Sequence, residues 1–422
     1  MTLSPARISR SRLGACALAV LPLIGSPAGA APRTVYAGTL QGAGEVVMEL
    51  EAAGGGKLTG RYFYARHGVD IPLAGTEAAL FEPKPYQERQ EAGLDPEEDA
   101  PAGRAAAWQG ARDADGYRGQ WTDLRSGKRR GFQLRRVAQY DPDALAPDSV
   151  QAVTDAISGG MGSGISVDAT IDAEHAPYET LKLAGHAVPA GPDVGAGAVA
   201  YRMWRDPRTQ FAYPRLSRHP DAKVRERING LLEQRHWQMS LAALACKASA
   251  YTDGNPAAGT LGSYDEESIT VNWLSTALMT VTESGSLYCG GAHPNNHFEP
   301  YTFDLLRGEY LDWNHVFDAY VSDEHGYRKE SPTLLEVVDA ARKALAPADG
   351  AIVAADDEAL EGCADLWPSY LALGAEAPGV LSLSVSGVGH AQGVCLGTHA
   401  VVPFEDLAPY LKPGGKAYLA VD

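Results

Sequence analysis

A polar loop, G-G-A-H-P-N-N-H at 290–297, is the densest group of potentially reactive side chains in the sequence. Within it, His293 and His297 lie four residues apart, and Glu299 and Asp304 follow shortly after. Imidazole and carboxylate groups are common zinc ligands, and two ligands four residues apart would share one face of a helix. Taken alone, this spacing would indicate a metal site.

The residues between the two histidines favour another interpretation. Pro294 is unsuited to a helix interior, because it lacks an N–H and clashes with the preceding turn. The two glycines allow a tight backbone path, in which His293 bonds to backbone groups. We therefore expect no metal and no cofactor, and we interpret the segment as a ligand-binding loop. Its candidate contact residues are His293, Asn295, Asn296 and His297.

A further histidine, His390, ends the run G-V-G-H. If folding brings His390 beside His293, the pair could perform general acid–base catalysis together with Asp304 or Asp312. The alternative is an exposed turn histidine. No G-x-S-x-G elbow, H-E-x-x-H pair or phosphate loop occurs in the sequence. We therefore add His390 to the candidate ligand-binding residues and assign no catalytic residue.

The first 30 residues have the pattern of a secretory signal peptide. Three arginines precede an apolar run at 13–24, and small residues at 26–30 end in A-G-A. This run is too short to cross a bilayer, and no later stretch reaches the roughly 18 apolar residues of a span. We expect cleavage near Ala30-Ala31 and export to the periplasm.

Four cysteines follow the leader, and an even number in an oxidising compartment predicts two disulfides. Three connectivities are possible. Pairing 363 with 395 would close a loop of roughly 30 residues, and pairing 246 with 289 one of roughly 40. No C-x-x-C pair suggests a metal site instead. The four residues are Cys246, Cys289, Cys363 and Cys395.

Residues 31–140 are predicted to form a small antiparallel β domain, because apolar residues alternate with others in runs such as V-V-M-E-L at 46–50. Within it, residues 82–107 are rich in Pro, Glu and Ala, which predicts a disordered insertion. Residues 141–164 end in G-G-M-G-S-G and are interpreted as a linker.

Residues 165–422 are predicted to form a second domain of the α+β class, with an antiparallel sheet and two main helices. One helix follows a cap at Asp221, with Val224 and Ile228 at helical spacing, and the other covers 334–345. Strand-like runs outnumber helices and do not alternate regularly with them, which favours α+β over a doubly wound sheet.

The chain has 36 basic and 53 acidic residues, a formal net charge of −17. Removal of the leader with its three arginines would bring it to about −20. Such a surface repels phosphate backbones, so a nucleic-acid partner is not expected. It would attract a strongly basic protein.

Several short motifs resemble those of a known family. They are Y-C-G-G-A-H-P-N at 288–295, F-D-L at 303–305, G-E-Y-L at 308–311 and Y-P-R-L at 213–216. Together they resemble the extracytoplasmic domain of unknown function found in RsiV-type anti-sigma factors and attached to some peptidoglycan deacetylases. The resemblance covers about residues 165–415.

In those anti-sigma factors the domain binds lysozyme, so the resemblance implies a binding role. No stretch of this sequence reads as their membrane helix or as the deacetylase catalytic domain. We therefore expect an exported, non-catalytic binding protein of the cell envelope. A lysozyme-like muramidase, another basic protein or a cell-wall glycan is its expected ligand. The alternative is a peptidoglycan hydrolase that uses His293, His390 and a nearby carboxylate.

Overall fold

The structure is a computed structural model. It describes residues 31–95, 101–144, 171–209, 211–251, 267–287, 295–324, 328–345, 363, 366 and 369–419. The expected signal peptide, most of the expected linker, Cys289 and His293 lie outside these residues.

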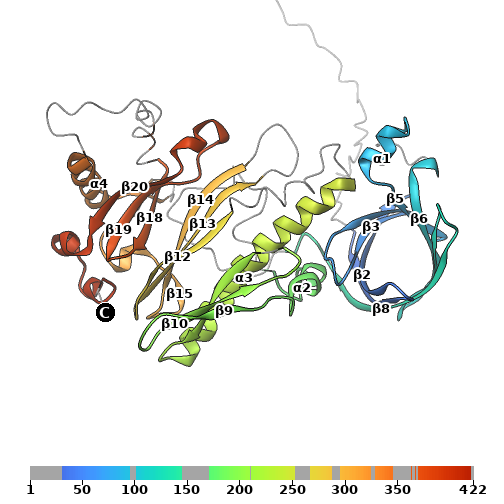
Figure 1. Cartoon of the computed structure of the whole chain (residues 1–422), viewed down its shortest axis with the longest axis horizontal. Coiled ribbons are helices and arrows are strands. Elements are labelled where there is room, and N and C mark those ends of the chain that lie inside the picture. Colours follow the sequence, from blue (N-terminus) through green and yellow to red (C-terminus); the bar gives the residue numbers. More distant parts are fainter. Residues whose placement is uncertain are drawn as a thin grey trace, which may run out of the picture.

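Eight antiparallel strands close into a barrel over residues 33–140, seen end-on in Figure 1. Each strand pairs with the next, and β1 also pairs with β8. The N-terminal domain is thus antiparallel as predicted, and closure leaves it without an open sheet edge. The strands are β1 (Arg33–Leu40), β2 (Gly44–Gly54), β3 (Lys57–Tyr64), β4 (Ile71–Thr76), β5 (Ala79–Pro83), β6 (Arg104–Arg112), β7 (Gly116–Asp123) and β8 (Arg129–Tyr140).

The barrel interior is a packed core. The alternating residues Val46, Met48 and Leu50 of β2 belong to one buried cluster with inward side chains of the other strands. Aromatic rings fill much of this space, and the ring of Trp108 lies 4.9 Å from that of Phe132 between centroids. Side chains therefore occupy the centre, as expected for a barrel of this size.

The stretch 82–107, predicted to be disordered, contributes to this barrel. It holds the end of β5, the helix α1 (Tyr86–Glu91), the short 3-10 helix η1 (Pro101–Gly103) and the start of β6. Glu82, Ala106 and Ala107 are buried. The Pro- and Glu-rich composition is real, but pairing of β5 with β6 places the ends of the stretch in the barrel wall.

The region after the barrel begins with a helix and a three-stranded sheet. The order of that sheet is β11-β10-β9. The long helix α3 follows, and the side chain of Asp221 accepts hydrogen bonds from the backbone N–H groups of Lys223 and Val224 at its start. The bounds are α2 (Pro177–Leu183), β9 (Val188–Val194), β10 (Ala200–Arg205), β11 (Ala212–Arg218), α3 (Ala222–Ala248) and the 3-10 helix η2 (Ser249–Tyr251).

The remaining strands form three further antiparallel sheets, in the orders β12-β13-β14-β15, β16-β17 and β18-β19-β20. The strands are β12 (Ser268–Leu274), β13 (Leu278–Leu287), β14 (Asn295–Asp304), β15 (Glu309–Tyr310), β16 (Tyr320–Ser322), β17 (Arg328–Glu330), β18 (Leu371–Glu376), β19 (Val380–Val385) and β20 (Gly397–Pro403). The helices are α4 (Pro332–Leu345) and the 3-10 helices η5 (Trp313–His315), η8 (His390–Cys395), η9 (Phe404–Tyr410) and η10 (Gly415–Ala417).

The α+β class is confirmed, and α3 and α4 cover the two predicted helical segments. Where one antiparallel sheet was expected in the second region, the structure has several. Two cores result. Ile228 and Leu232 of α3 pack with Val281 and Tyr301 of the β12–β15 sheet, whereas α4 packs with β18–β20.

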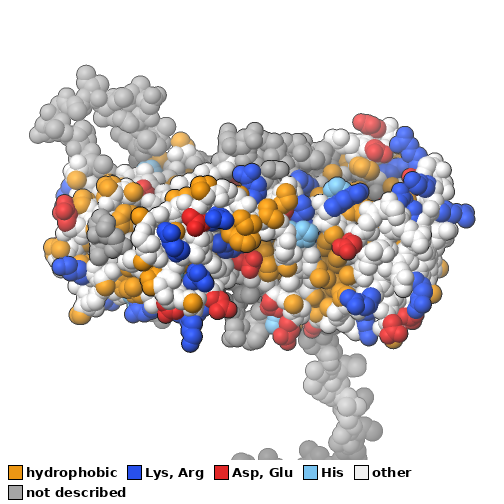
Figure 2. Space-filling model, turned by 60° about the horizontal axis from the view of Figure 1, so that its bottom comes forward, with side chains coloured by type: hydrophobic (Ala, Val, Ile, Leu, Met, Phe, Trp, Pro, Cys, Tyr) orange, Lys and Arg blue, Asp and Glu red, His pale blue; other side chains and the backbone are white. Residues whose placement is uncertain are grey.

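A disulfide joins Cys363 to Cys395, the last residue of η8, with the Cα atoms 5.3 Å apart. Cys246 is buried near the end of α3, and a second predicted disulfide falls on Cys289, outside the described residues. No described helix is both long enough and apolar enough to cross a membrane. On the face in Figure 2, basic side chains are spread among acidic ones, so the negative net charge is not gathered there.

Candidate functional site

Two of the segments singled out in the sequence lie side by side. Asn296 and His297 stand near the start of β14, and η8 begins at His390. Gly393 of η8 is so close to Asn296 that a β-carbon at position 393 would lie 2.6 Å from Asn296 Nδ2. Folding therefore brings η8 against the strand that follows the predicted ligand-binding loop.

His297 is held by a carboxylate that the sequence patterns did not indicate. Its Nε2 lies 2.8 Å from Oε1 of Glu267, whose side chain is almost fully buried. Burial alone would lower the pKa of His297, but the hydrogen bond and charge of Glu267, with Glu299 and Glu283 behind it, raise this pKa. The imidazole is thus held in place by Glu267, and its partner is neither of the carboxylates, Glu299 and Asp304, that its spacing suggested.

A second network lies between the sheet and α3, beside His297. Glu283 of β13 and Glu299 of β14 are directly opposite each other. Arg235 of α3 binds Glu283 with both ends of its guanidinium, at 2.9 Å from Nε to Oε1 and 2.5 Å from NH2 to Oε2. The hydroxyl of Tyr213 donates to the same carboxylate at 2.7 Å. The carboxylate of Glu283 is therefore neutralised by a bidentate guanidinium.

The other side chains of this network also have fixed roles. The guanidinium of Arg235 stacks 4.1 Å above the centre of the Tyr301 ring, and its NH1 donates to Gln238 at 2.6 Å. Burial, and then the nearby carboxylates, raise the pKa values of Tyr213 and Tyr301 well above the usual range. Burial, assisted by Arg215, lowers the pKa of the adjacent His236 to about 4. Neutral phenols and a neutral imidazole in this setting stabilise the core.

Asp304 and Asp312, named for acid–base chemistry with His390, lie elsewhere. Asp304 ends β14, eight residues after Asn296 and therefore about 26 Å along the strand. Its Oδ1 accepts from two backbone N–H groups, and its Oδ2 accepts from the Tyr418 hydroxyl at 2.9 Å. Asp312 accepts from the backbone of Asn314 at the start of η5. Neither carboxylate is placed to assist η8.

The Asp304 end of the strand also holds three groups of metal-ligand type. Ligand atoms of Asp304, Glu309 and His315 all lie within 4.8 Å of one another. However, the guanidinium of Arg307 lies 3.2 Å from Asp304 Oδ2, on the oxygen that Tyr418 also binds. A cation would have to displace this guanidinium. The donor set is therefore poorly suited to a metal.

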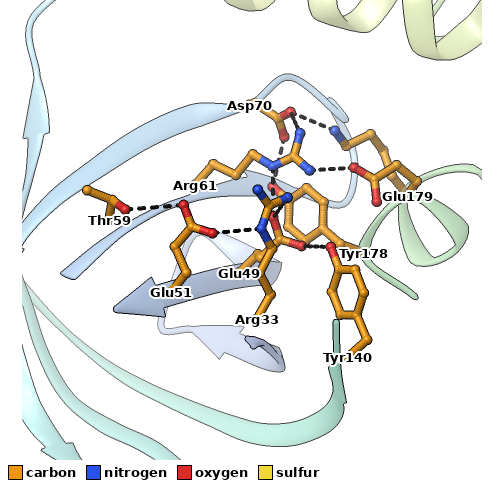
Figure 3. Close-up of polar contacts among 10 residues, drawn as sticks. Arg33, Glu49, Glu51, Thr59, Arg61, Asp70, Tyr140, Tyr178 and Glu179 are labelled. Carbon is orange, nitrogen blue, oxygen red and sulfur yellow. Dashed lines mark hydrogen bonds and ion pairs between the residues drawn. The ribbon is translucent and has the colours of Figure 1, made fainter. Parts of the chain in front are cut away.

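An extended ion-pair network joins the barrel to α2 (Figure 3). Arg61 of β3 lies at its centre, with Nε 3.2 Å from Glu49, NH1 3.2 Å from Asp70 and a further ion pair to Glu179 of α2. Lys182 of α2 donates to Asp70 at 2.8 Å. Around this core, Arg33 binds Glu51 and Glu49, and the hydroxyls of Tyr140 and Tyr178 donate to Glu49 and Asp70.

The Arg61 network secures the two regions to each other. The side chain of Lys182 is only 1% exposed, and burial lowers its pKa although Asp70 opposes the shift. Beside it, the ring of Tyr178 packs against Phe63, Val35 and Val47 on the outside of the barrel. A depressed lysine pKa can indicate a nucleophile, but this amine has a carboxylate partner and almost no exposure. We interpret the network as structural.

The sequence held a partial signal for these residues. Arg235 follows Ile228 and Leu232 at spacings of seven and three, so it lies on the buried face of α3. Glu283 alternates with the buried Val281 and Met279 of β13. A charged residue on a predicted apolar face is a candidate for a buried pair, although its partner cannot be read from spacing. Compared with known proteins, the chain matches no family model and no curated sequence.

Proposed function

We propose that the protein is an exported, non-catalytic binding protein of the cell envelope. Its second region would engage a protein or cell-wall ligand, and a basic, lysozyme-like muramidase is the first candidate. The motif resemblance in residues 165–415 suggests this role. The proximity of η8 and the start of β14 supports it, because the residue types of both segments suggest ligand contact.

The surface formed by η8 and β14 has the character of a protein-binding site. Val394 in η8 is 63% exposed, the most exposed of the large apolar side chains in the described part of the chain. His390 and Gln392 are exposed beside it, and Asn296 is half-buried against η8. The Cys363–Cys395 disulfide fixes one end of η8. In a complex, Val394 would supply the apolar centre of the contact and its polar neighbours the rim.

Charge supports a basic partner for this region and not for the barrel. Residues 31–144 carry 15 basic and 17 acidic side chains, whereas residues 145–422 carry 18 and 36. The negative charge of the protein thus belongs almost entirely to the second region. Long-range attraction would increase the rate of association with a cationic protein there, and this effect weakens as salt rises.

Calorimetric titration of residues 31–422 with lysozyme tests the proposal. We expect saturable binding that persists at physiological salt, and no comparable binding of a second basic protein of similar size. Binding of both proteins that disappears with added salt would reduce the effect to non-specific charge attraction. Absence of lysozyme binding at low salt would contradict the muramidase assignment.

A pair of matched variants tests the surface itself. Val394→Lys places a positive charge on η8, and Val188→Lys makes the same change on β9, where Val188 is 51% exposed. We expect Val394→Lys to weaken lysozyme binding at least tenfold, because a charge enters the contact and repels a cationic partner. Val188→Lys should change affinity less than twofold. Equal effects of the two substitutions would exclude η8 as the contact surface.

A further inference from the structure

A buried carboxylate near one rim of the barrel is bound only by neutral groups. Glu82, near the end of β5, is 7% exposed. Its Oε1 accepts three hydrogen bonds, from the Tyr62 hydroxyl at 2.9 Å and from the indole N–H groups of Trp108 and Trp121 at 2.7 Å each. Three donors on one oxygen hold the carboxylate in a single orientation.

The second oxygen of Glu82 has no hydrogen-bond partner among the described residues, and the side chain forms no ion pair with them. The Glu82 side chain keeps a small exposed fraction of 7%. Burial raises the pKa of Glu82 although the three donors oppose the shift. A buried carboxylate without a counter-charge is unfavourable. The negative charge of Glu82 is therefore not balanced by a cation among the described residues.

Aromatic rings surround this carboxylate where the barrel opens. Strands β3, β5 and β7 run in the same direction, since each neighbouring pair is antiparallel, so their C-terminal ends lie at one rim. Tyr64 and Trp121 occupy these ends and are half-buried. Tyr251 of η2 is close enough for the charge of Glu82 to contribute, after burial, to raising its pKa. Aromatic side chains from β3, β6, β7 and η2 therefore lie around Glu82 at this rim.

Charged groups of both signs lie near this rim. Arg66 stacks on Tyr64, with its guanidinium 5.8 Å from the ring centre. Arg130 donates to the backbone carbonyl of Gln41 at 2.8 Å. Neither arginine forms an ion pair with Glu82. Asp123 is near enough to raise the pKa of Glu82 further. Among the described residues, no cation is therefore paired with the carboxylate of Glu82.

We propose that the mouth of the barrel binds a small primary amine in its ammonium form, with Oε2 of Glu82 as the acceptor. Aromatic faces attract ammonium groups through their quadrupole, and the mouths of β-barrels are common ligand sites. A primary ammonium can donate an N–H to Oε2 of Glu82, whereas a quaternary ammonium has no N–H to donate. This site is separate from the η8 surface and does not depend on the function proposed for it.

The two indole N–H groups that bind Glu82 provide a direct readout. In the chain with 15N-labelled tryptophan, seven indole signals are expected, and Trp121→Phe identifies that of Trp121. We expect n-butylammonium to shift the Trp108 and Trp121 signals saturably and to leave the others unchanged. Tetramethylammonium should bind at least fivefold more weakly, and n-butanol should cause no shift. Absence of a saturable shift with n-butylammonium would overturn the proposal, as would an equal response to n-butanol.

Two variants separate a local site from general charge attraction. Glu82→Gln keeps an oxygen for the three donors and removes the charge, so it should weaken n-butylammonium binding at least tenfold. Glu45→Gln removes the same charge from an exposed position on β2 at this rim and should bind like the parent. Unchanged binding by Glu82→Gln would overturn the proposal. If that variant does not fold, as judged by circular dichroism, the comparison of n-butylammonium with n-butanol on the parent chain decides.

Discussion

The barrel and the second region each bury a glutamate, and the two differ in what neutralises it. Glu283 in the second region is 2% exposed and receives a bidentate guanidinium from Arg235 and a hydroxyl from Tyr213. Glu82 in the barrel is 7% exposed and accepts hydrogen bonds from one hydroxyl and two indole N–H groups, and no cation of the described residues pairs with it. Both carboxylates are hydrogen-bonded, but only one is balanced in charge.

This difference separates closed polar networks from open ones. The network of Glu283 and that of Asp70 at the barrel–α2 contact contain their own cations, so nothing further is needed to offset the buried charge. Among the described residues, Glu82 has no such cation, and its Oε2 accepts no hydrogen bond from them. A balanced buried pair indicates a structural role, whereas an unbalanced buried carboxylate beside half-exposed rings indicates a place for a ligand.

Removing the cation from the closed network should have the largest effect. In Arg235→Met, the buried carboxylate of Glu283 keeps the Tyr213 hydroxyl as a donor but loses its cation. Glu283 would then be a buried carboxylate without a counter-charge, like Glu82, but with one donor where Glu82 has three. We expect the free energy of unfolding to fall by about 3–5 kcal/mol, the range for a broken buried pair. Urea denaturation followed by circular dichroism measures it. Arg235→Lys keeps the charge but not the bidentate geometry, so it should lose less stability than Arg235→Met. A loss below 1 kcal/mol in Arg235→Met would show that Glu283 is not dependent on its cation.

Removing the charge of Glu82 from the open network should raise the free energy of unfolding, where loss of Arg235 lowers it. Glu82→Gln is expected to stabilise the fold by about 1–3 kcal/mol at pH 8, since a buried polar group without full compensation is unfavourable by that amount. The folded-state pKa of Glu82 is raised, so its penalty is absent below the unfolded value of 4.5 and grows as the pH rises through the folded value. The parent should therefore lose stability relative to the variant above about pH 4.5. Parallel pH profiles of unfolding for the two proteins would contradict this.

Local patterns in the sequence were sufficient to predict individual strands and helices, but not to predict that the barrel closes. The alternation at Val46, Met48 and Leu50 predicts a strand with one buried face. Closure depends on the pairing of β1 with β8, such as Tyr36 with Arg136, a hundred residues apart. No short-range pattern encodes such a contact. Composition misled at 82–107, because proline and glutamate are typical of exposed segments, whereas Glu82 is buried by the strands on either side of it.

The candidate sites show the same limit. The polar loop at 290–297 and His390 could be identified by residue type, but the contact between Asn296 and η8 depends on how two sheets pack. The partner of His297, Glu267, is thirty residues earlier in the chain and follows no motif. Asp304 looked close to His297 in sequence, yet a strand between them carries it about 23 Å away. An extended strand separates residues that are close in sequence, such as His297 and Asp304. Tertiary packing brings together residues that are far apart in sequence, such as His297 and Glu267.

The smallest loss of stability is expected at the pair of His297 and Glu267, in which the imidazole side chain is 18% exposed and the carboxylate side chain 3%. His297→Gln removes the cation that faces Glu267. The folded-state pKa of His297 is raised above 6.5, so its stabilisation is complete below pH 6.5 and is lost as the pH rises through the folded value. We expect a loss below about 1 kcal/mol at pH 6, the usual size for a partly exposed pair, and a smaller loss at pH 9, both measured by urea denaturation.

Glu267→Gln tests whether this pH dependence of stability comes from the pairing of His297 with Glu267. Glu267→Gln should remove the same fall in stability above pH 6.5, and the double variant should lose less than the sum of the single losses, since both changes break one interaction. A strictly additive double variant would mean that other carboxylates, Glu299 or Glu283, raise the pKa of His297. In that case His297 would belong to the Glu283 network, whose negative charge would then exceed what Arg235 alone neutralises.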